Sequence, residues 1–175
     1  MKPRNRWRSR LAKLGCSPVV RSWLTEPGSL TARCQRGCER FAVRLLAFGK
    51  DRPLSDEAVE NSPGLAWVRE VALECDGVPV IFAHTTLPAA GNGRLTCWMA
   101  RLGNRSLGSL LFRYPGFSRG AIEFLRLDVR HPLYVRAARV AKVPPQLWAR
   151  RSWHALGGQR VLVTEVFLPA IERLG

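Results

Sequence analysis

The chain has 175 residues, of which 46% are hydrophobic and 23% are charged, and this balance excludes a disordered protein. The length is that of one globular domain, and no apolar run approaches the ~18–20 residues that a membrane span needs. Lys and Arg outnumber Asp and Glu by 28 to 13, which gives a formal net charge of +15. Since the basic residues follow no nucleic-acid-binding motif, we expect no nucleic acid as a partner and interpret the charge as a basic surface that attracts a small anion.

Residues 1–20 are predicted to form a basic tail, partly disordered, ahead of a single domain at residues 21–175. The tail begins "MKPRNRWRSRLAKLG", without an acidic residue and without the apolar core of a secretory signal. We therefore expect a cytoplasmic protein whose tail makes at most weak contact with an anionic membrane surface.

Five cysteines are scattered along the chain, and no second Cys or His pair completes a zinc-binding set. Reduced thiols and the absence of a metal site are the expectation for such a pattern in a cytosolic protein.

The first elements in chain order are a helix that begins at Ser29, whose hydroxyl can cap the first turn, and a strand at residues 41–48. Two apolar-patterned runs then flank Asp76 and Gly77, which is typical of a β-hairpin with a two-residue turn. Two short helices follow in "RLTCWMARLG" and "NRSLGSLLFRYPG", the second capped by Ser106.

The last elements are a strand in "AIEFLRL", a partly helical connection over residues 128–146 and a second hairpin that turns at Gly157 and Gly158. Two hairpins and two further strands, with helices between them, predict a single α+β domain in which an antiparallel sheet carries helices on one side.

Two charges interrupt apolar strand faces. Strand alternation places Glu165 on one face with Val161, Val163 and Phe167, and it makes Arg69 the only charge on the core-facing side of its strand. Because a buried charge without a partner costs several kcal/mol, both side chains must find partners in the protein or in a ligand.

Partners inside the protein are one possibility. Arg69 and Glu165 can pair with each other, or a two-residue turn in the second hairpin sets Arg150 opposite Glu165. The same counting in the first hairpin sets His84 opposite Arg69, where we interpret it as a neutral, hydrogen-bonded lining residue.

A ligand pocket is the other possibility. Helices capped at Ser29 and Ser106 leave the backbone N–H groups of Leu30 and Leu107 directed outward at the positive end of a helix dipole, where an anion can bind. With Arg69 and Glu165, they suit a small molecule with carboxylates at one end and a hydroxyl group at the other.

Five segments carry a family resemblance: "SWLTEPGSLTARC", "WVREVALECDGVPVIFAHTTLP", "RLGNRSLGSLLFR", "LWARRSWHALGG" and "VLVTEVFLPA". In order and spacing, over roughly residues 23 to 170, they resemble the chorismate lyase family. The resemblance implies a six-stranded antiparallel sheet with helical flaps that close over a buried ligand pocket. It also implies a lyase that needs neither a metal ion nor an organic cofactor, and we expect it to be a monomer.

The family's functional positions fall on four residues. The resemblance implies that Arg69 binds the substrate carboxylate, that Glu165 hydrogen-bonds the ring hydroxyl, and that the amides of Leu30 and Leu107 complete the pocket. The implied reaction removes pyruvate from chorismate to give 4-hydroxybenzoate, the first committed step of ubiquinone synthesis. At one position the chain departs from the family pattern: the resemblance implies Arg where this sequence has His84.

A binding protein without catalytic activity is the alternative. The effector-binding domains of GntR-type transcription regulators are similar to this fold and sense small molecules in a comparable pocket. They normally follow a winged-helix domain, for which there is no room before residue 20, so we favour the enzyme.

Overall fold

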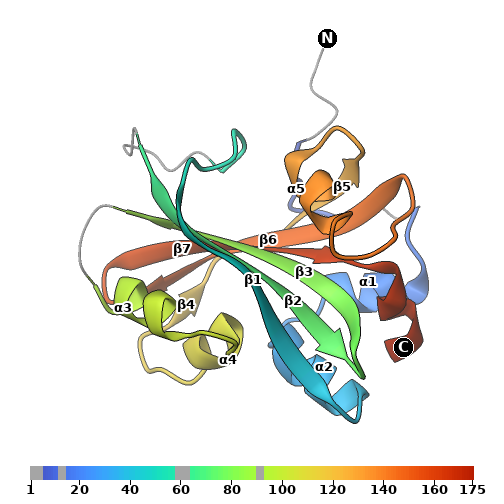
Figure 1. Ribbon diagram of the computed structural model, residues 1–175, viewed down its shortest axis with the longest axis horizontal. Coiled ribbons are helices and arrows are strands. Elements are labelled where there is room, and N and C mark those ends of the chain that lie inside the picture. Colours follow the sequence, from blue (N-terminus) through green and yellow to red (C-terminus); the bar gives the residue numbers. More distant parts are fainter. Residues whose placement is uncertain (1–5, 12–14, 58–63, 90–92) are drawn as a thin grey trace.

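The computed structural model describes residues 6–11, 15–57, 64–89 and 93–175, which fold around one curved antiparallel sheet (Figure 1). The seven-stranded sheet has the order β1-β2-β3-β7-β6-β4, and β5 also pairs with β6. The strands are β1 (Phe41–Asp51), β2 (Ala66–Cys75), β3 (Val78–Pro88), β4 (Ser118–Arg119), β5 (Glu123–Asp128), β6 (Gln146–Leu156) and β7 (Gln159–Phe167). The helices are α1 (Pro18–Leu24), α2 (Leu30–Gly37), α3 (Arg94–Arg101), α4 (Leu107–Leu111), α5 (Pro132–Ala137) and a 3₁₀ helix at Pro169–Leu174.

Both predicted hairpins are confirmed. Asp76 and Gly77 adopt φ angles of 53° and 81°, and Gly157 and Gly158 adopt 57° and 79°. A two-residue turn that follows the twist of its strands needs positive φ at both positions, which glycine and aspartate tolerate better than most residues. The turn sequences therefore fix where β2 meets β3 and where β6 meets β7.

The helix that was predicted at Ser29 is α2. The hydroxyl of Ser29 accepts a hydrogen bond from the N–H of Ala32 at 3.3 Å, as expected for a cap. The two short helices predicted after the first hairpin are α3 and α4. Ser106 directly precedes α4, and its hydroxyl lies 2.6 Å from that of Thr31 in α2, so a hydrogen bond joins the starts of the two helices.

The sheet has seven strands where six were expected. The additional strand, β4, is only Ser118–Arg119 and pairs with Ala155 and His154 of β6. Two residues are too few to show an alternating pattern, so sequence periodicity carries no signal for this strand.

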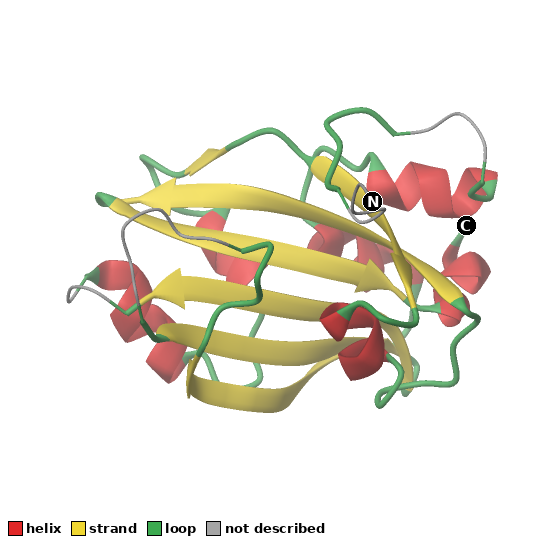
Figure 2. Ribbon diagram, turned by 90° about the horizontal axis from the view of Figure 1, so that it is seen from above, coloured by secondary structure: helices red, strands yellow, loops and turns green. Residues whose placement is uncertain are grey.

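Helices lie on both faces of the sheet (Figure 2), whereas the sequence pattern predicted helices on one face only. Helices α1 to α4 lie on the face that carries Ile81, Val161 and Phe167. Helix α5 packs on the opposite face, against the apolar cluster that includes Phe82 and Val166. Both faces need a cover because both are apolar.

Part of the predicted tail packs on the domain. Trp7 is buried, its Nε1 donates a hydrogen bond to Asp56 at 2.7 Å, and Arg8 forms an antiparallel bridge with Phe124. The division of the chain at residue 20 falls within α1. That residues 1–20 form a separate tail stays a prediction.

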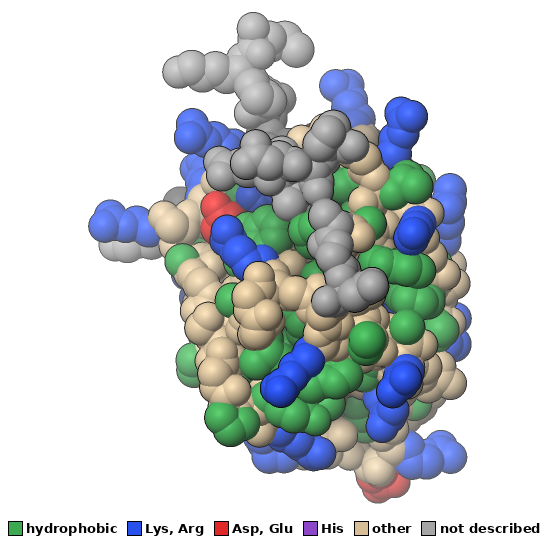
Figure 3. Space-filling model, turned by 90° about the vertical axis from the view of Figure 1, so that its left-hand side faces the viewer, with side chains coloured by type: hydrophobic (Ala, Val, Ile, Leu, Met, Phe, Trp, Pro, Cys, Tyr) green, Lys and Arg blue, Asp and Glu red, His purple; other side chains and the backbone are tan. Residues whose placement is uncertain are grey.

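Basic side chains are spread over the surface. Figure 3 shows Lys and Arg scattered across the face in view and not gathered into one patch. None of the helices in the described ranges has the length and apolar character needed to cross a membrane.

His84 does not lie opposite Arg69 as predicted. A register shift between Leu73 and Glu74 moves the pairing by one residue, so His84 faces Glu70 and Arg69 faces Thr85. Because a shift of one residue changes the face, His84 points away from the side of the sheet that carries Arg69.

On that opposite face, His84 belongs to a buried ionic cluster with Glu57, Glu70 and Arg136. Its Nδ1 lies 2.9 Å from a Glu70 oxygen and its Nε2 lies 3.1 Å from Glu57, while Arg136 forms an ion pair with Glu70. Burial alone would lower the pKa of His84, but hydrogen bonds to the two carboxylates raise it to about 9. The prediction of a neutral lining residue was wrong.

His84→Gln tests this cluster. Because the pKa of His84 rises from 6.5 to about 9 on folding, its proton stabilises the fold fully below pH 6.5, and this stabilisation is lost as the pH rises through 9. The stability advantage of the wild type over the variant should shrink by roughly 3 kcal/mol across this range. Urea unfolding at several pH values measures it, and a difference that does not change with pH would contradict the cluster.

Candidate active site

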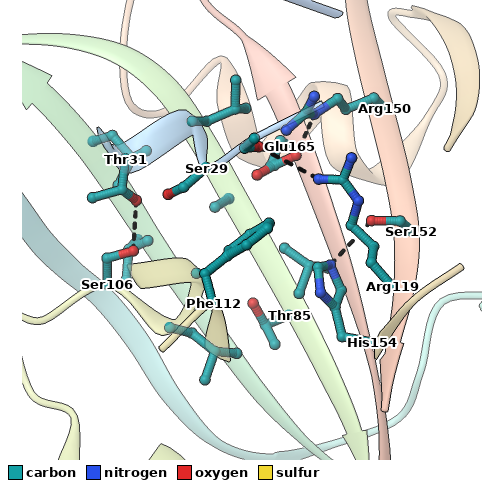
Figure 4. Close-up of a pocket in the computed structure, with 18 of the residues that line it drawn as sticks. Ser29, Thr31, Thr85, Ser106, Phe112, Arg119, Arg150, Ser152, His154 and Glu165 are labelled. Carbon is teal, nitrogen blue, oxygen red and sulfur yellow. Dashed lines mark hydrogen bonds and ion pairs between the residues drawn. The ribbon is translucent and has the colours of Figure 1, made fainter. Parts of the chain in front are cut away.

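A small pocket lies on the sheet face that carries α2 and α4 (Figure 4). All four predicted site residues line it: Leu30, Arg69, Leu107 and Glu165. Strands β2, β3, β7 and β6 form its floor, and the starts of α2 and α4 form its roof. The cavity measures about 50 Å³, room for a few water molecules. A larger ligand therefore enters only if the roof moves.

Strand register sets the spacing of the charged groups on the floor. Arg69, Thr85, Val163 and Ser152 lie in one row across the four strands. Glu165 lies on β7, two strands away from Arg69, which corresponds to about 10 Å across the sheet. Glu165 forms its ion pair with Arg150, and Arg69 donates to two backbone carbonyls, so the predicted alternative of an ion pair between Arg69 and Glu165 is wrong.

Arg69 is buried without a carboxylate partner among the described residues. Its Nη2 donates to the carbonyl oxygens of Gly103 at 2.8 Å and Arg105 at 2.7 Å, in the segment between α3 and α4. Burial lowers the pKa of Arg69 to about 10, so the group stays charged at neutral pH. Neutral carbonyls orient the guanidinium but leave its charge uncompensated, which favours a bound anion.

Glu165 is paired with Arg150, as the second alternative predicted. The two residues face each other across β6 and β7, and Arg150 Nε donates to Glu165 Oε2 at 2.6 Å. Arg150 also donates to the carbonyl oxygen of Glu26 at 2.7 Å, which fixes the guanidinium beside the end of α1. Glu165 is thus a fixed carboxylate that can accept a hydrogen bond from a ligand hydroxyl.

Three further residues that the sequence did not predict also line the pocket: Arg119, Ser152 and His154. Ser152 and His154 continue the alternation of Arg150 along β6, and that pattern would have placed them on the pocket face. Arg119 comes from the two-residue strand β4, for which the sequence holds no comparable signal. Burial, followed by the charge of Arg150, lowers the pKa of Arg119.

The roof brings two helix starts together. Leu30 is the first residue of α2 and Leu107 the first of α4, and the first N–H groups of a helix have no acceptor within it. The hydrogen bond between Thr31 and Ser106 holds the two starts beside each other, and Phe112 extends over the pocket between them and β6 (Figure 4).

The pocket carries excess positive charge. Its described lining residues include three guanidinium groups, from Arg69, Arg119 and Arg150, and one carboxylate, from Glu165. Burial and the charges of Arg119 and Arg150 lower the pKa of His154 to about 4, so its ring is neutral. Two positive charges remain, which suits a dianion. Among the described residues, no group of three or more His, Cys, Asp or Glu side chains is arranged so that it could hold a metal ion.

Comparison with known sequences assigns the family. The family model described as chorismate lyase matches residues 2–173. A probable chorismate pyruvate-lyase of Dechloromonas aromatica is 68% identical over 98% of each chain. A second one, of Aromatoleum aromaticum, is 44% identical over 89% of this chain and 87% of the relative. The chain belongs to the chorismate lyase family.

Solved structures show the same fold at low sequence identity. A GntR-family transcriptional regulator of Bacillus cereus superposes with a TM-score of 0.53 and 14% identity, over 75% of this chain and 93% of that one. The C-terminal domain of a histidine utilization repressor of Pseudomonas syringae has a TM-score of 0.52 and 8% identity, over the same shares. The predicted α+β class is confirmed.

Arg150→Met tests the ion pair at the floor. The substitution leaves the Glu165 carboxylate and the Glu26 carbonyl without their donor, so the free energy of unfolding should fall by about 3 kcal/mol. The exposed Arg139, replaced by Met in the same way, should change it by less than about 0.5 kcal/mol. Equal losses in the two variants, measured by urea unfolding, would show that the pair does not stabilise the fold.

Proposed function

We propose that the pocket binds chorismate and converts it to 4-hydroxybenzoate and pyruvate. The observation that carries the proposal is the charge of the enclosed pocket: guanidinium groups of Arg69 and Arg119 at opposite ends, with the Glu165 carboxylate between them. Chorismate is a dianion with a ring hydroxyl, so its charges and its donor complement this arrangement. Membership in the chorismate lyase family supports the same substrate.

Each polar group of the substrate has a partner in this proposal. The ring carboxylate binds the guanidinium of Arg69 and the backbone N–H of Leu107, and the N–H of Leu30 adds a second donor at the roof. The ring hydroxyl donates a hydrogen bond to Glu165, whose charge is held in place by Arg150. The carboxylate of the enolpyruvyl side chain then lies toward Arg119.

The bond changes of the reaction take place within the substrate. The ether bond to the ring breaks, the neighbouring ring carbon that bears the hydroxyl loses its hydrogen, and the released enolpyruvate gains one hydrogen to become pyruvate. The ring becomes aromatic, which supplies the driving force. The protein holds the reactive conformer and stabilises the charge that develops on the leaving oxygen.

Opening of the roof controls exchange of ligands. Because the cavity of about 50 Å³ is closed over by α2 and α4, product leaves only after the two helix starts separate. Release of the aromatic acid is therefore a candidate for the step that limits turnover.

We further propose that the protein works as a monomer in the cytoplasm, without a cofactor or metal ion. Its product, 4-hydroxybenzoate, enters ubiquinone synthesis. Light scattering coupled to size-exclusion chromatography measures the oligomeric state.

Mixing the purified protein with chorismate tests the activity. Ultraviolet absorbance should show 4-hydroxybenzoate accumulating, with an equal amount of pyruvate released. Saturable binding of chorismate without turnover would favour an effector-binding protein instead.

Arg69→Ala removes the proposed anchor of the ring carboxylate. Loss of a buried, charge-assisted contact should lower kcat/KM for chorismate by about a hundredfold or more. Arg139→Ala, which removes the same charge from an exposed site, should leave it unchanged. Near-normal activity of Arg69→Ala in a folded protein would exclude the anchor.

Glu165→Gln separates orientation of the hydroxyl from proton transfer. The amide keeps the shape and one acceptor but loses the charge, so we expect a loss of about tenfold in kcat if the residue orients the substrate. A loss of about a thousandfold, with normal affinity for 4-hydroxybenzoate, would assign proton transfer to Glu165.

A further inference from the structure

The ring of His154 has one nitrogen without a partner. Among the described residues, four buried side-chain atoms lack a hydrogen bond, on Trp23, Glu57, His154 and Thr164. Of these residues only His154 lines the pocket, where the residue is 6% exposed and its Nδ1 is the unpartnered atom. A buried polar atom without a partner destabilises the folded protein unless a water molecule or a ligand satisfies it.

The surroundings of the ring determine what its Nδ1 offers. The other nitrogen, Nε2, lies 3.0 Å from the hydroxyl of Ser152, and Phe117 stacks on the ring at 5.4 Å. The low pKa of His154, about 4, keeps the ring neutral at physiological pH. When the Ser152 hydroxyl donates to Nε2, the single ring proton sits on Nδ1, so the unpartnered atom is a donor.

The position of His154 identifies the part of a ligand that it meets. His154 and Arg119 are directly paired across β6 and β4, at the edge of the pocket farthest from Arg69 on β2. In Figure 4 both side chains extend toward the pocket from the same side, with Phe112 and Thr85 across from His154. In the tautomer in which the Ser152 hydroxyl donates to Nε2, the ring offers a neutral donor beside a guanidinium, which is a suitable site for a carboxylate.

We infer that His154 binds the carboxylate of the enolpyruvyl side chain, through a hydrogen bond from Nδ1, while Arg119 neutralises its charge. The inference rests on the function proposed above, which places the ring carboxylate at Arg69 and leaves this corner for the side chain. His154 thereby positions the leaving group relative to the ring. It also distinguishes the substrate from 4-hydroxybenzoate, which has no such side chain.

Comparing chorismate with 4-hydroxybenzoate distinguishes binding of the side-chain carboxylate by His154 from a purely structural role of this residue. His154→Leu should lower kcat/KM for chorismate about tenfold, the factor that loss of one hydrogen bond to a charged group typically carries. Its dissociation constant for 4-hydroxybenzoate, measured by fluorescence or calorimetry, should stay at the wild-type value. Thermal unfolding confirms that the variant is folded.

Two conservative variants provide a matched pair. The amide nitrogen of Asn is bonded to Cγ, as Nδ1 of histidine is, so it can take the place of Nδ1. The amide nitrogen of Gln lies one bond farther from the backbone, near the position of Nε2. His154→Asn should therefore restore most of the activity that His154→Leu loses, and His154→Gln should not.

Three results would overturn the inference. An unchanged kcat/KM in His154→Leu, an equal weakening of chorismate turnover and of 4-hydroxybenzoate binding, or better rescue by Gln than by Asn would each assign His154 another role. If the wild-type protein releases no pyruvate from chorismate, the proposed function is wrong. If the wild type is active and one of the three results above is found, only the role inferred for His154 is wrong.

Discussion

The site depends on one buried guanidinium group, whose acceptors among the described residues are all neutral. Arg69 is 2% exposed and its partners are the carbonyl oxygens of Gly103 and Arg105. Removing a cation from water without an opposing charge is costly, and that cost falls when an anion binds. The floor register and the closed roof matter because they keep this charge away from water and at a fixed distance from Glu165.

The two faces of the sheet differ in whether their buried charges have partners of opposite charge inside the protein. On the face of α5, His84 and Arg136 meet Glu57 and Glu70, so the buried charges satisfy one another inside the protein. On the pocket face, Arg150 neutralises Glu165, whereas no carboxylate in the described part of the chain forms an ion pair with Arg69 or Arg119. Buried charge on the first face stabilises the fold, and buried charge on the second is available for a ligand. The same sheet, shared with GntR-type regulators, carries both.

Turns and strand alternation made much of the site predictable. The turn at Gly157 and Gly158 is a regular two-residue turn, so counting along both strands correctly placed Arg150 opposite Glu165. Counting failed for His84 because a bulge at Val80 changes the register between Leu73 and Glu74. Pro79, which has no N–H to donate to the neighbouring strand, is the sequence signal that could have indicated it. Arg119 was missed because two residues form no pattern. Helices were predicted on one side of the sheet only, and α5 lies on the other side because both faces of the sheet are apolar.

A crystal structure with bound 4-hydroxybenzoate tests the central claim most directly. The ligand carboxylate should lie within hydrogen-bonding distance of the Arg69 guanidinium, with its hydroxyl group on Glu165 and the two helix starts closed above it. A ligand carboxylate bound elsewhere, with Arg69 contacting only the carbonyl oxygens of Gly103 and Arg105, would contradict it.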